Sequence, residues 1–157
     1  AQPIPQVATT PAGAPVTAAS FTTWPADRVP AYIWPTKPLP EGLTFNAPAG
    51  DPARGQQIYS RSACIGCHAI AGNPMSVGQI GPNLTHVGSR LTIGAGLYPN
   101  DDQHLALWIK NTRVMKPGAI MPTLGKGQYD PIAKVQVTSG LTDQQIADIV
   151  AYLRALK

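Results

Sequence analysis

The stretch that decides the predicted fold of this chain is Cys64-Ile65-Gly66-Cys67-His68. Two cysteines separated by two residues, with a histidine directly after the second, form the pattern of covalent c-type haem attachment. Each thiol can add to one vinyl group of the porphyrin, and the adjacent imidazole is then held beneath the iron as its proximal ligand. The five residues therefore predict one covalent haem c, attached through Cys64 and Cys67 and ligated by His68.

Three other interpretations of the cysteine pair are weaker. A thioredoxin-like redox pair belongs with a βαβ pattern, and no alternation of strand and helix patterns is present. A structural zinc ion needs four ligands, and the chain has only two cysteines. A disulfide across so short a loop would constrain the unfolded chain little. Haem attachment is favoured, and the redox pair without haem is the main alternative.

Length and composition indicate one domain with much irregular backbone. The chain has 157 residues, including 17 prolines and 15 glycines, and only 13% of its residues are charged. Its formal net charge is +4, but Lys and Arg are scattered singly after residue 50. This spacing argues against a nucleic-acid partner. A mildly basic surface either serves solubility or steers an acidic redox partner.

The sequence also suggests a location outside the cytoplasm. No apolar run approaches the roughly 18 residues that a membrane span needs. The chain begins at Ala1 without an initiator Met, which is consistent with a processed export signal. Because haem c is attached outside the cytoplasm, we expect the periplasm or the outer face of the cell membrane, with peripheral association or anchoring through a partner or a lipid.

Residues 1–50 are predicted to form an extended arm, because they hold ten of the prolines and show almost no helical periodicity. From Phe21 onward, aromatic side chains appear among the prolines, and aromatic surface is usually buried. Two interpretations stay open. The arm either wraps over its own domain, or it docks in extended form on a partner protein.

Three helices are predicted within residues 51–157. The first covers residues 51–62, with Asp51 as N-cap. The second covers residues 100–113, with Asn100 as N-cap in a capping box. The last is capped by Thr142 in a second capping box and runs to the C-terminus. A short strand is expected near residues 134–137. The predicted inner face of the second helix comprises Leu105, Trp108, Ile109 and Thr112.

A distal ligand is sought among the remaining soft or basic side chains. Met121 lies on a loop between prolines, and a thioether is a suitable ligand for haem iron. From the residues alone the alternatives stay open: Met75, Met115, His86 and His104. On the proximal side, the carbonyl of Pro82 is a candidate acceptor for the second ring N–H of His68, with a plain turn as the alternative.

Residues 50–157 resemble the class I cytochromes c. The matching residues are Gly55 and Tyr59, the haem motif, Gly81-Pro82-Asn83-Leu84, Lys116-Pro117-Gly118 with Met121-Pro122, and Tyr152. The resemblance implies an all-α class I cytochrome c fold around one covalent haem at residues 51–157, preceded by the arm at residues 1–50. It further implies that the first and last helices cross near Gly55 and Tyr152, that Pro82 accepts a hydrogen bond from His68, and that Met121 is the distal ligand.

Within that family the loops around Pro82 and Met121 look most similar to the monohaem domains of respiratory complexes. These are the domains fused to subunit II of haem-copper oxidases and the monohaem subunit of alternative complex III. No copper-binding domain precedes the haem motif in this chain, which departs from a complete oxidase subunit II.

The expected function is one-electron transfer rather than catalysis, with redox proteins as partners and no small-molecule substrate at the iron. We expect a subunit or tethered partner of a membrane respiratory complex. A freely diffusing periplasmic shuttle and the haem subunit of a sulfur-compound oxidising enzyme are the alternatives. Arg90 and Trp108 are predicted to lie near the haem propionates, with packing or surface roles as the plain alternative.

Overall fold

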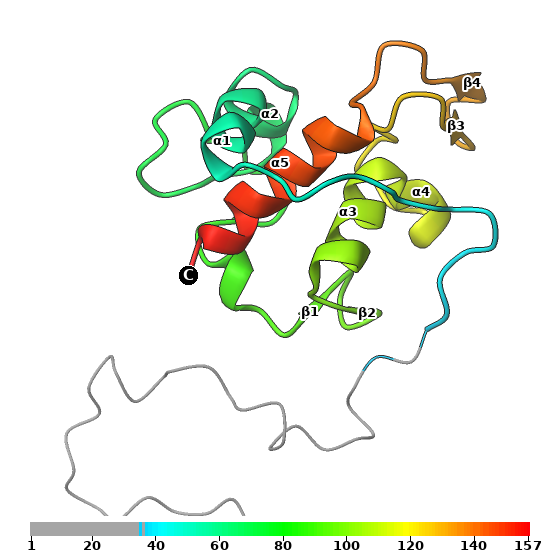
Figure 1. The fold of residues 1–157 in the computed structure, drawn as a ribbon, viewed down its shortest axis with the longest axis horizontal. Coiled ribbons are helices and arrows are strands. Elements are labelled where there is room, and N and C mark those ends of the chain that lie inside the picture. Colours follow the sequence, from blue (N-terminus) through cyan, green and yellow to red (C-terminus); the bar gives the residue numbers. More distant parts are fainter. Residues whose placement is uncertain (1–34, 36) are drawn as a thin grey trace, which may run out of the picture. The chain divides into compact units, whose positions relative to one another are not determined.

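The computed structural model describes Pro35 and residues 37–157. Residues 1–34 and 36, with the aromatic side chains expected to be buried at Phe21, Trp24, Tyr32 and Trp34, lie outside the described residues. The described helices are α1 (Pro52–Ser60), α2 (Cys64–Cys67), the 3-10 helix η4 (Val87–Ser89), α3 (Asp102–Lys110), α4 (Thr112–Met115) and α5 (Asp143–Ala155) (Figure 1). None of these helices is long and apolar enough to cross a membrane.

Four short strands accompany the helices. Strand β1 (Thr92–Ile93) pairs antiparallel with β2 (Tyr98–Pro99), and β3 (Tyr129–Asp130) pairs antiparallel with β4 (Val135–Gln136). The strand expected near residues 134–137 is thus present as β4. The purely helical description is incomplete, because two small ladders occupy the long connections before α3 and after α4.

Helices α1 and α5 cross at backbone contact (Figure 1). A Cβ atom placed on Gly55 would lie 1.9 Å from the carbonyl oxygen of Asp148, so only glycine permits this approach. One turn along, the rings of Tyr59 and Tyr152 meet with centroids 5.6 Å apart. The crossing expected near Gly55 and Tyr152 is therefore confirmed.

A buried carboxylate stabilises the same helix crossing. The Asp148 side chain is only 4% exposed and accepts two hydrogen bonds from Arg54, at 3.0 Å from Nε and 2.9 Å from Nη2. It also accepts the backbone N–H of Asp51 at 2.8 Å. The Arg54 guanidinium lowers the pKa of Asp148 to about 2, despite the opposing effect of burial. Asp148 thereby joins the start of α1 to the middle of α5.

Asp148→Asn should lower the free energy of unfolding by roughly 2 kcal/mol, because it removes charge-assisted hydrogen bonds from a buried group. Since the pKa of Asp148 is lowered from 3.8 to about 2, its stabilisation is present above about pH 4 and is lost as the pH falls to about 2. Denaturant unfolding of both proteins at pH 7 and pH 3 measures this. Equal differences at both pH values would contradict the assignment.

The ends of the helices follow the sequence in part. The capping box of Thr142 and Gln145 at α5 is present, and Asp51 caps α1 by accepting the N–H of Arg54. Helix α1 ends at Ser60, two residues earlier than expected, and α2 begins after a short break. The haem motif is therefore a separate turn of helix.

The expected N-cap of α3 was wrong. Asp101, not Asn100, caps this helix by accepting the backbone N–H of His104 at 2.8 Å. The Asn100 side chain is buried and donates instead to the carbonyl oxygens of Val87 and Arg90. The helix also ends at Lys110, because Asn111 leaves the helical conformation and its side chain caps α4. A tertiary contact thus overrides the local capping pattern.

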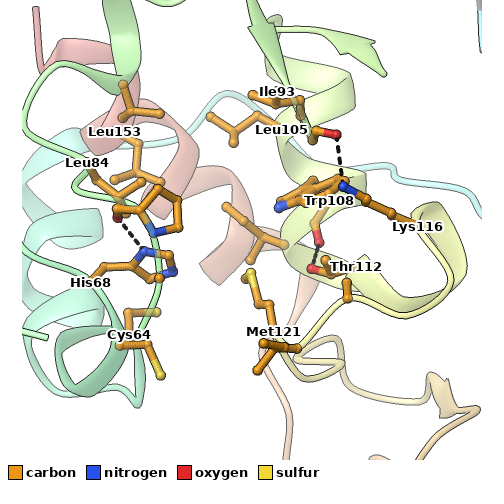
Figure 2. Close-up of a pocket in the computed structure, with 18 of the residues that line it drawn as sticks. Cys64, His68, Leu84, Ile93, Leu105, Trp108, Thr112, Lys116, Met121 and Leu153 are labelled. Carbon is orange, nitrogen blue, oxygen red and sulfur yellow. Dashed lines mark hydrogen bonds between the residues drawn. The ribbon is translucent and has the colours of Figure 1, made fainter. Parts of the chain in front are cut away.

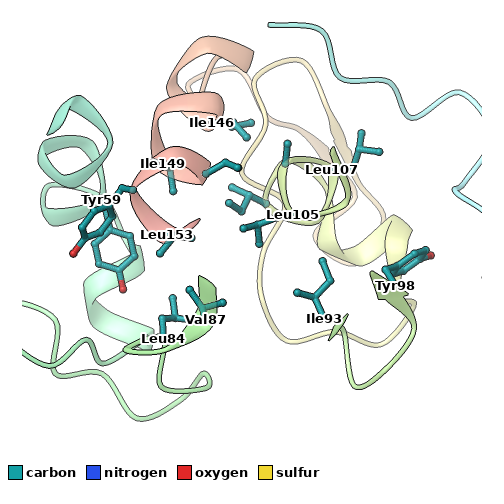
Figure 3. Close-up of a cluster of buried hydrophobic side chains, with 14 of the residues drawn as sticks. Tyr59, Leu84, Val87, Ile93, Tyr98, Leu105, Leu107, Ile146, Ile149 and Leu153 are labelled. Atoms are coloured by element: carbon teal, nitrogen blue, oxygen red, sulfur yellow. The ribbon is translucent and has the colours of Figure 1, made fainter. Parts of the chain in front are cut away.

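The core lies between α1, α3 and α5 (Figure 3). Leu105 and Ile109 of α3 are 4% exposed, and Ile149 and Leu153 of α5 are equally enclosed. Because Leu105, Ile109, Ile149 and Leu153 also line the cavity described below, the core and the cavity share one wall. The inner face expected for the second helix is divided between two helices: Trp108 of α3 is partly buried, and Thr112, fully buried, belongs to α4.

Residues 37–50, which we call the strap, lie along the folded domain. Lys37 Nζ donates to the carbonyl oxygen of Met115 at 2.8 Å, and Leu43 is buried in the core. Lys110 Nζ donates to the Thr44 carbonyl oxygen at 2.8 Å and forms an ion pair with Asp143. This part of the arm therefore contributes to the domain, while the boundary expected at residue 50 stays a prediction.

Candidate haem site

One apolar cavity of about 730 Å³ opens between the α1–α2 side of the domain and the α3–α4 side (Figure 2). Its volume is in the range of cofactor sites, and its lining is mostly hydrophobic with few polar groups. Cys64, Cys67 and His68 line one side, and Met121 lines the other. The motif of the first half of the chain and the methionine of the second half therefore meet at a single site.

The two cysteines are presented by α2. They are three residues apart on a single helical turn, which places them on one face. Both are free thiols in the structure, so the pair is not joined as a disulfide. Burial raises the pKa of the Cys64 thiol. No group of three or more His, Cys, Asp or Glu side chains that could hold a metal ion occurs among the described residues.

The His68 ring is held by its second nitrogen. Nδ1 lies 2.8 Å from the carbonyl oxygen of Pro82, which can only accept, so Nδ1 carries the proton. Nε2 is then left with its lone pair, as a metal ligand requires. A Cβ atom on Gly81 would lie 2.4 Å from Cε1 of the ring, so the ring packs directly on the glycine backbone.

Buried hydroxyls support the backbone of the same histidine. Ser76 Oγ donates to the His68 carbonyl oxygen at 2.7 Å and lies 3.0 Å from the Tyr59 hydroxyl. Burial raises the pKa of Tyr59 to about 12, so this hydroxyl stays protonated near neutral pH. The role of Ser76 could not be predicted, because a lone serine in a loop carries no pattern.

Met121 is the only one of the five distal-ligand candidates that lines the cavity. Figure 2 shows its thioether directed into the cavity from the wall opposite His68. Met75 is 60% exposed, and Met115 is fully buried in the core outside the cavity. The two histidines are bonded elsewhere: His86 to the Lys157 carbonyl oxygen and His104 to the Asp101 carboxylate.

Arg90 and Trp108 both line the cavity, and their proximity to the haem propionates stays a prediction. Arg90 donates to the Asn83 carbonyl oxygen. The Trp108 ring packs on Gly94, where a Cβ atom would lie 2.7 Å from the indole. Residues 94–96 also line the cavity, and this was not predicted from the sequence. The available signal was Gly94-Ala95-Gly96, whose three residues all adopt positive φ.

These residues fit a haem c. Two thiols on one helical turn, an imidazole with its Nε2 lone pair free and a thioether on the opposite wall surround a cavity of suitable volume. The profile of the cytochrome c family matches residues 52–157 of the sequence. The chain belongs to the cytochrome c family.

This cytochrome c carries one covalently bound haem c. It is 31% identical over 104 residues to cytochrome c oxidase subunit 2 from Alkalihalophilus pseudofirmus. The match covers 66% of this chain and 25% of the relative, so the chain spans about a quarter of the length of the curated relative it matches.

Two solved structures are similar to this cytochrome c. SoxXA from P. pantotrophus aligns with a TM-score of 0.52 and 24% identity, covering 78% of this chain and 99% of that chain. This similarity shows the fold. Ferric cytochrome c-550 from Paracoccus versutus aligns with a TM-score of 0.36 and 21% identity, covering 66% and 95% of the two chains.

Gly81→Ala should displace the His68 ring, because the new methyl group would overlap the imidazole. We expect the free energy of unfolding of the haem protein to fall by roughly 1–3 kcal/mol, as for other overpacked sites. Denaturant unfolding followed at the haem absorbance measures the change. Gly66→Ala is the control, since a Cβ atom there meets nothing within 4 Å. Equal stability of the two variants would contradict the packing described.

Proposed function

We propose that this cytochrome c transfers single electrons between redox proteins, with His68 and Met121 as the axial ligands of its haem. The haem, when bound, supplies a ferric–ferrous couple. The observation that carries the proposal is the placement of His68 and Met121 on opposite walls of one cavity, while the other candidate ligands lie outside it.

The chain's own residues would keep the site rigid and dry. Pro82 fixes the tautomer and orientation of His68 through the 2.8 Å hydrogen bond. Leu105, Ile109 and Leu153 form an apolar wall that excludes water from the cavity. Because His68 and Met121 would both hold the iron, no ligand position would be left for a substrate. Such a site suits electron transfer rather than catalysis.

Met121→Ala should abolish the Met-to-iron charge-transfer band of the ferric protein, because it removes the only methionine sulfur in the cavity. Visible absorption spectra of the purified ferric variants measure this. Met75→Ala is the matched control, since Met75 is 60% exposed outside the cavity and its loss should leave the band intact. A band that persists in Met121→Ala would assign the ligand to another methionine.

We further propose that this cytochrome c works as a subunit or tethered partner of a membrane respiratory complex, in the periplasm or on the outer face of the cell membrane. The 31% identity to an oxidase subunit 2 supports the complex. Ile80 and Ile120 also support it, because they line the cavity, are 71% and 79% exposed, and so offer apolar surface to a partner next to the haem.

Deletions within the arm test the proposed association with a membrane complex. Deletion of residues 1–34 leaves the strap intact, so we expect an unchanged haem spectrum together with weaker co-purification with a membrane complex. Deletion of residues 1–50 is the comparison, since it also removes buried Leu43 and the contacts of Lys37. We expect this longer deletion to lower the unfolding midpoint. Unfolding of the haem domain by the shorter deletion would instead assign residues 1–34 a role in the domain itself.

A sulfur-compound oxidising role receives no support from the site. Both cysteines of the chain belong to the haem motif, so none is left to bind a sulfur substrate. The similarity to SoxXA is one of fold.

A further inference from the structure

The loop that carries Met121, residues 116–123, has few contacts at its tip. Ile120 is 79% exposed, and Pro122 is exposed as well. Hydrophobic packing of these neighbours therefore does not determine where the thioether lies. The position of Met121 depends on what holds the loop on either side of it.

Arg113 of α4 and Asp130 of β3 form hydrogen bonds with the loop backbone on both sides of Met121. Arg113 Nη2 donates to the Ile120 carbonyl oxygen at 3.3 Å, directly before Met121. The Asp130 carboxylate accepts the backbone N–H of Thr123 at 3.4 Å, two residues after it. Arg113 Nη1 lies 2.7 Å from both Asp130 oxygens, so the two anchors are joined. We call Arg113 and Asp130 the loop clamp.

A second polar contact fixes the same end of the loop. The buried Thr123 hydroxyl lies 3.0 Å from Asn111 Oδ1 and donates to it. Asn111 Nδ2 donates in turn to the Tyr129 carbonyl oxygen at 3.2 Å. The loop, the α3–α4 junction and the β3–β4 hairpin thus share one network. The hairpin thereby supplies the carboxylate of the clamp.

Stability alone does not explain a buried ion pair at this position. Asp130 is 3% exposed, and the buried Nε of Arg113 has no hydrogen-bond partner among the described residues. A buried ion pair often adds less stability than apolar packing of the same volume, but it defines geometry strictly. The hydrogen bonds from Arg113 lower the pKa of Asp130, which keeps the carboxylate charged across the physiological range.

We propose that Asp130 and Arg113 are positioning residues that hold Met121 in place as a ligand and set how often it leaves the iron. The proposal rests on the proposed function, because it requires Met121 to be the distal ligand. The clamp bonds to the loop backbone on both sides of Met121, and neither Arg113 nor Asp130 lines the cavity.

Asp130→Asn tests the clamp. In the ferric protein, added imidazole can bind only after Met121 has left, so its rate at saturating imidazole reports loop opening. We expect this rate to rise roughly tenfold, corresponding to the loss of one charge-assisted hydrogen bond from the closed loop. The Met-to-iron charge-transfer band should weaken in parallel. Arg113→Lys, which keeps the charge but loses the two-pronged contact, should give an intermediate rate.

Asp148→Asn is the matched control, because Asp148 is also 3% exposed and paired with an arginine, but at the α1–α5 crossing. It should lower stability without changing the imidazole rate. A wild-type rate and band in Asp130→Asn would overturn the proposal. An equal acceleration in Asp148→Asn would also overturn it, since the effect would then follow from stability in general.

Two further results keep the outcomes distinct. If Asp130→Asn does not give a folded haem protein, Arg113→Lys decides, because lysine keeps the positive charge but lacks the second nitrogen that bonds the Ile120 carbonyl oxygen while the first bonds Asp130. Faster imidazole binding in Arg113→Lys supports the clamp, and a wild-type rate overturns it. If Met121→Ala keeps the charge-transfer band, the ligand assignment itself fails. If that band is lost while Asp130→Asn behaves as wild type, only the clamp fails.

Discussion

The backbone contact between α1 and α5 determines where the haem motif lies relative to the core. At Gly55 the two helices are so close that a single methyl group would not fit. This approach places the haem motif, which follows α1, beside the Ile149 and Leu153 side of α5. The pairing of Arg54 with Asp148 holds the crossing in one register. The crossing thereby positions the proximal wall of the cavity without any contribution from the distal residues.

The two walls of the cavity are built in different ways. On the proximal side, His68 is positioned within a short stretch of chain, by Pro82, Gly81 and Ser76. On the distal side, Met121 belongs to an exposed loop that is tied to α4 and to the β3–β4 hairpin by polar groups. A packed wall resists displacement as a whole, whereas a tied loop moves when one tie is lost. Met121 is therefore the more adjustable of the two side chains.

This division bears on electron transfer. Limited movement of ligands between the two redox states favours rapid transfer, and exchange of a ligand would open the iron to small molecules. The buried pair of Arg113 and Asp130, which we propose restricts such exchange, lies outside the cavity. The strap adds a further connection, because Lys37 reaches the Met115 carbonyl oxygen at the end of α4. Elements remote from the motif thus act on the same site.

The sequence by itself determined the features that depend on neighbours in the chain. Haem attachment follows from five consecutive residues, and the caps of α1 and α5 follow from Asp51 and Thr142. Only the tertiary structure decided the features that join distant segments. Asn100 does not cap α3, because its side chain donates to two backbone carbonyl oxygens instead. Asp130 forms an ion pair with Arg113, which lies 17 residues away in the sequence. A polar side chain forms hydrogen bonds with whichever partner the folded chain brings close to it. Hydrophobic periodicity in the sequence predicts the apolar faces of helices and strands, but it does not predict these polar pairs.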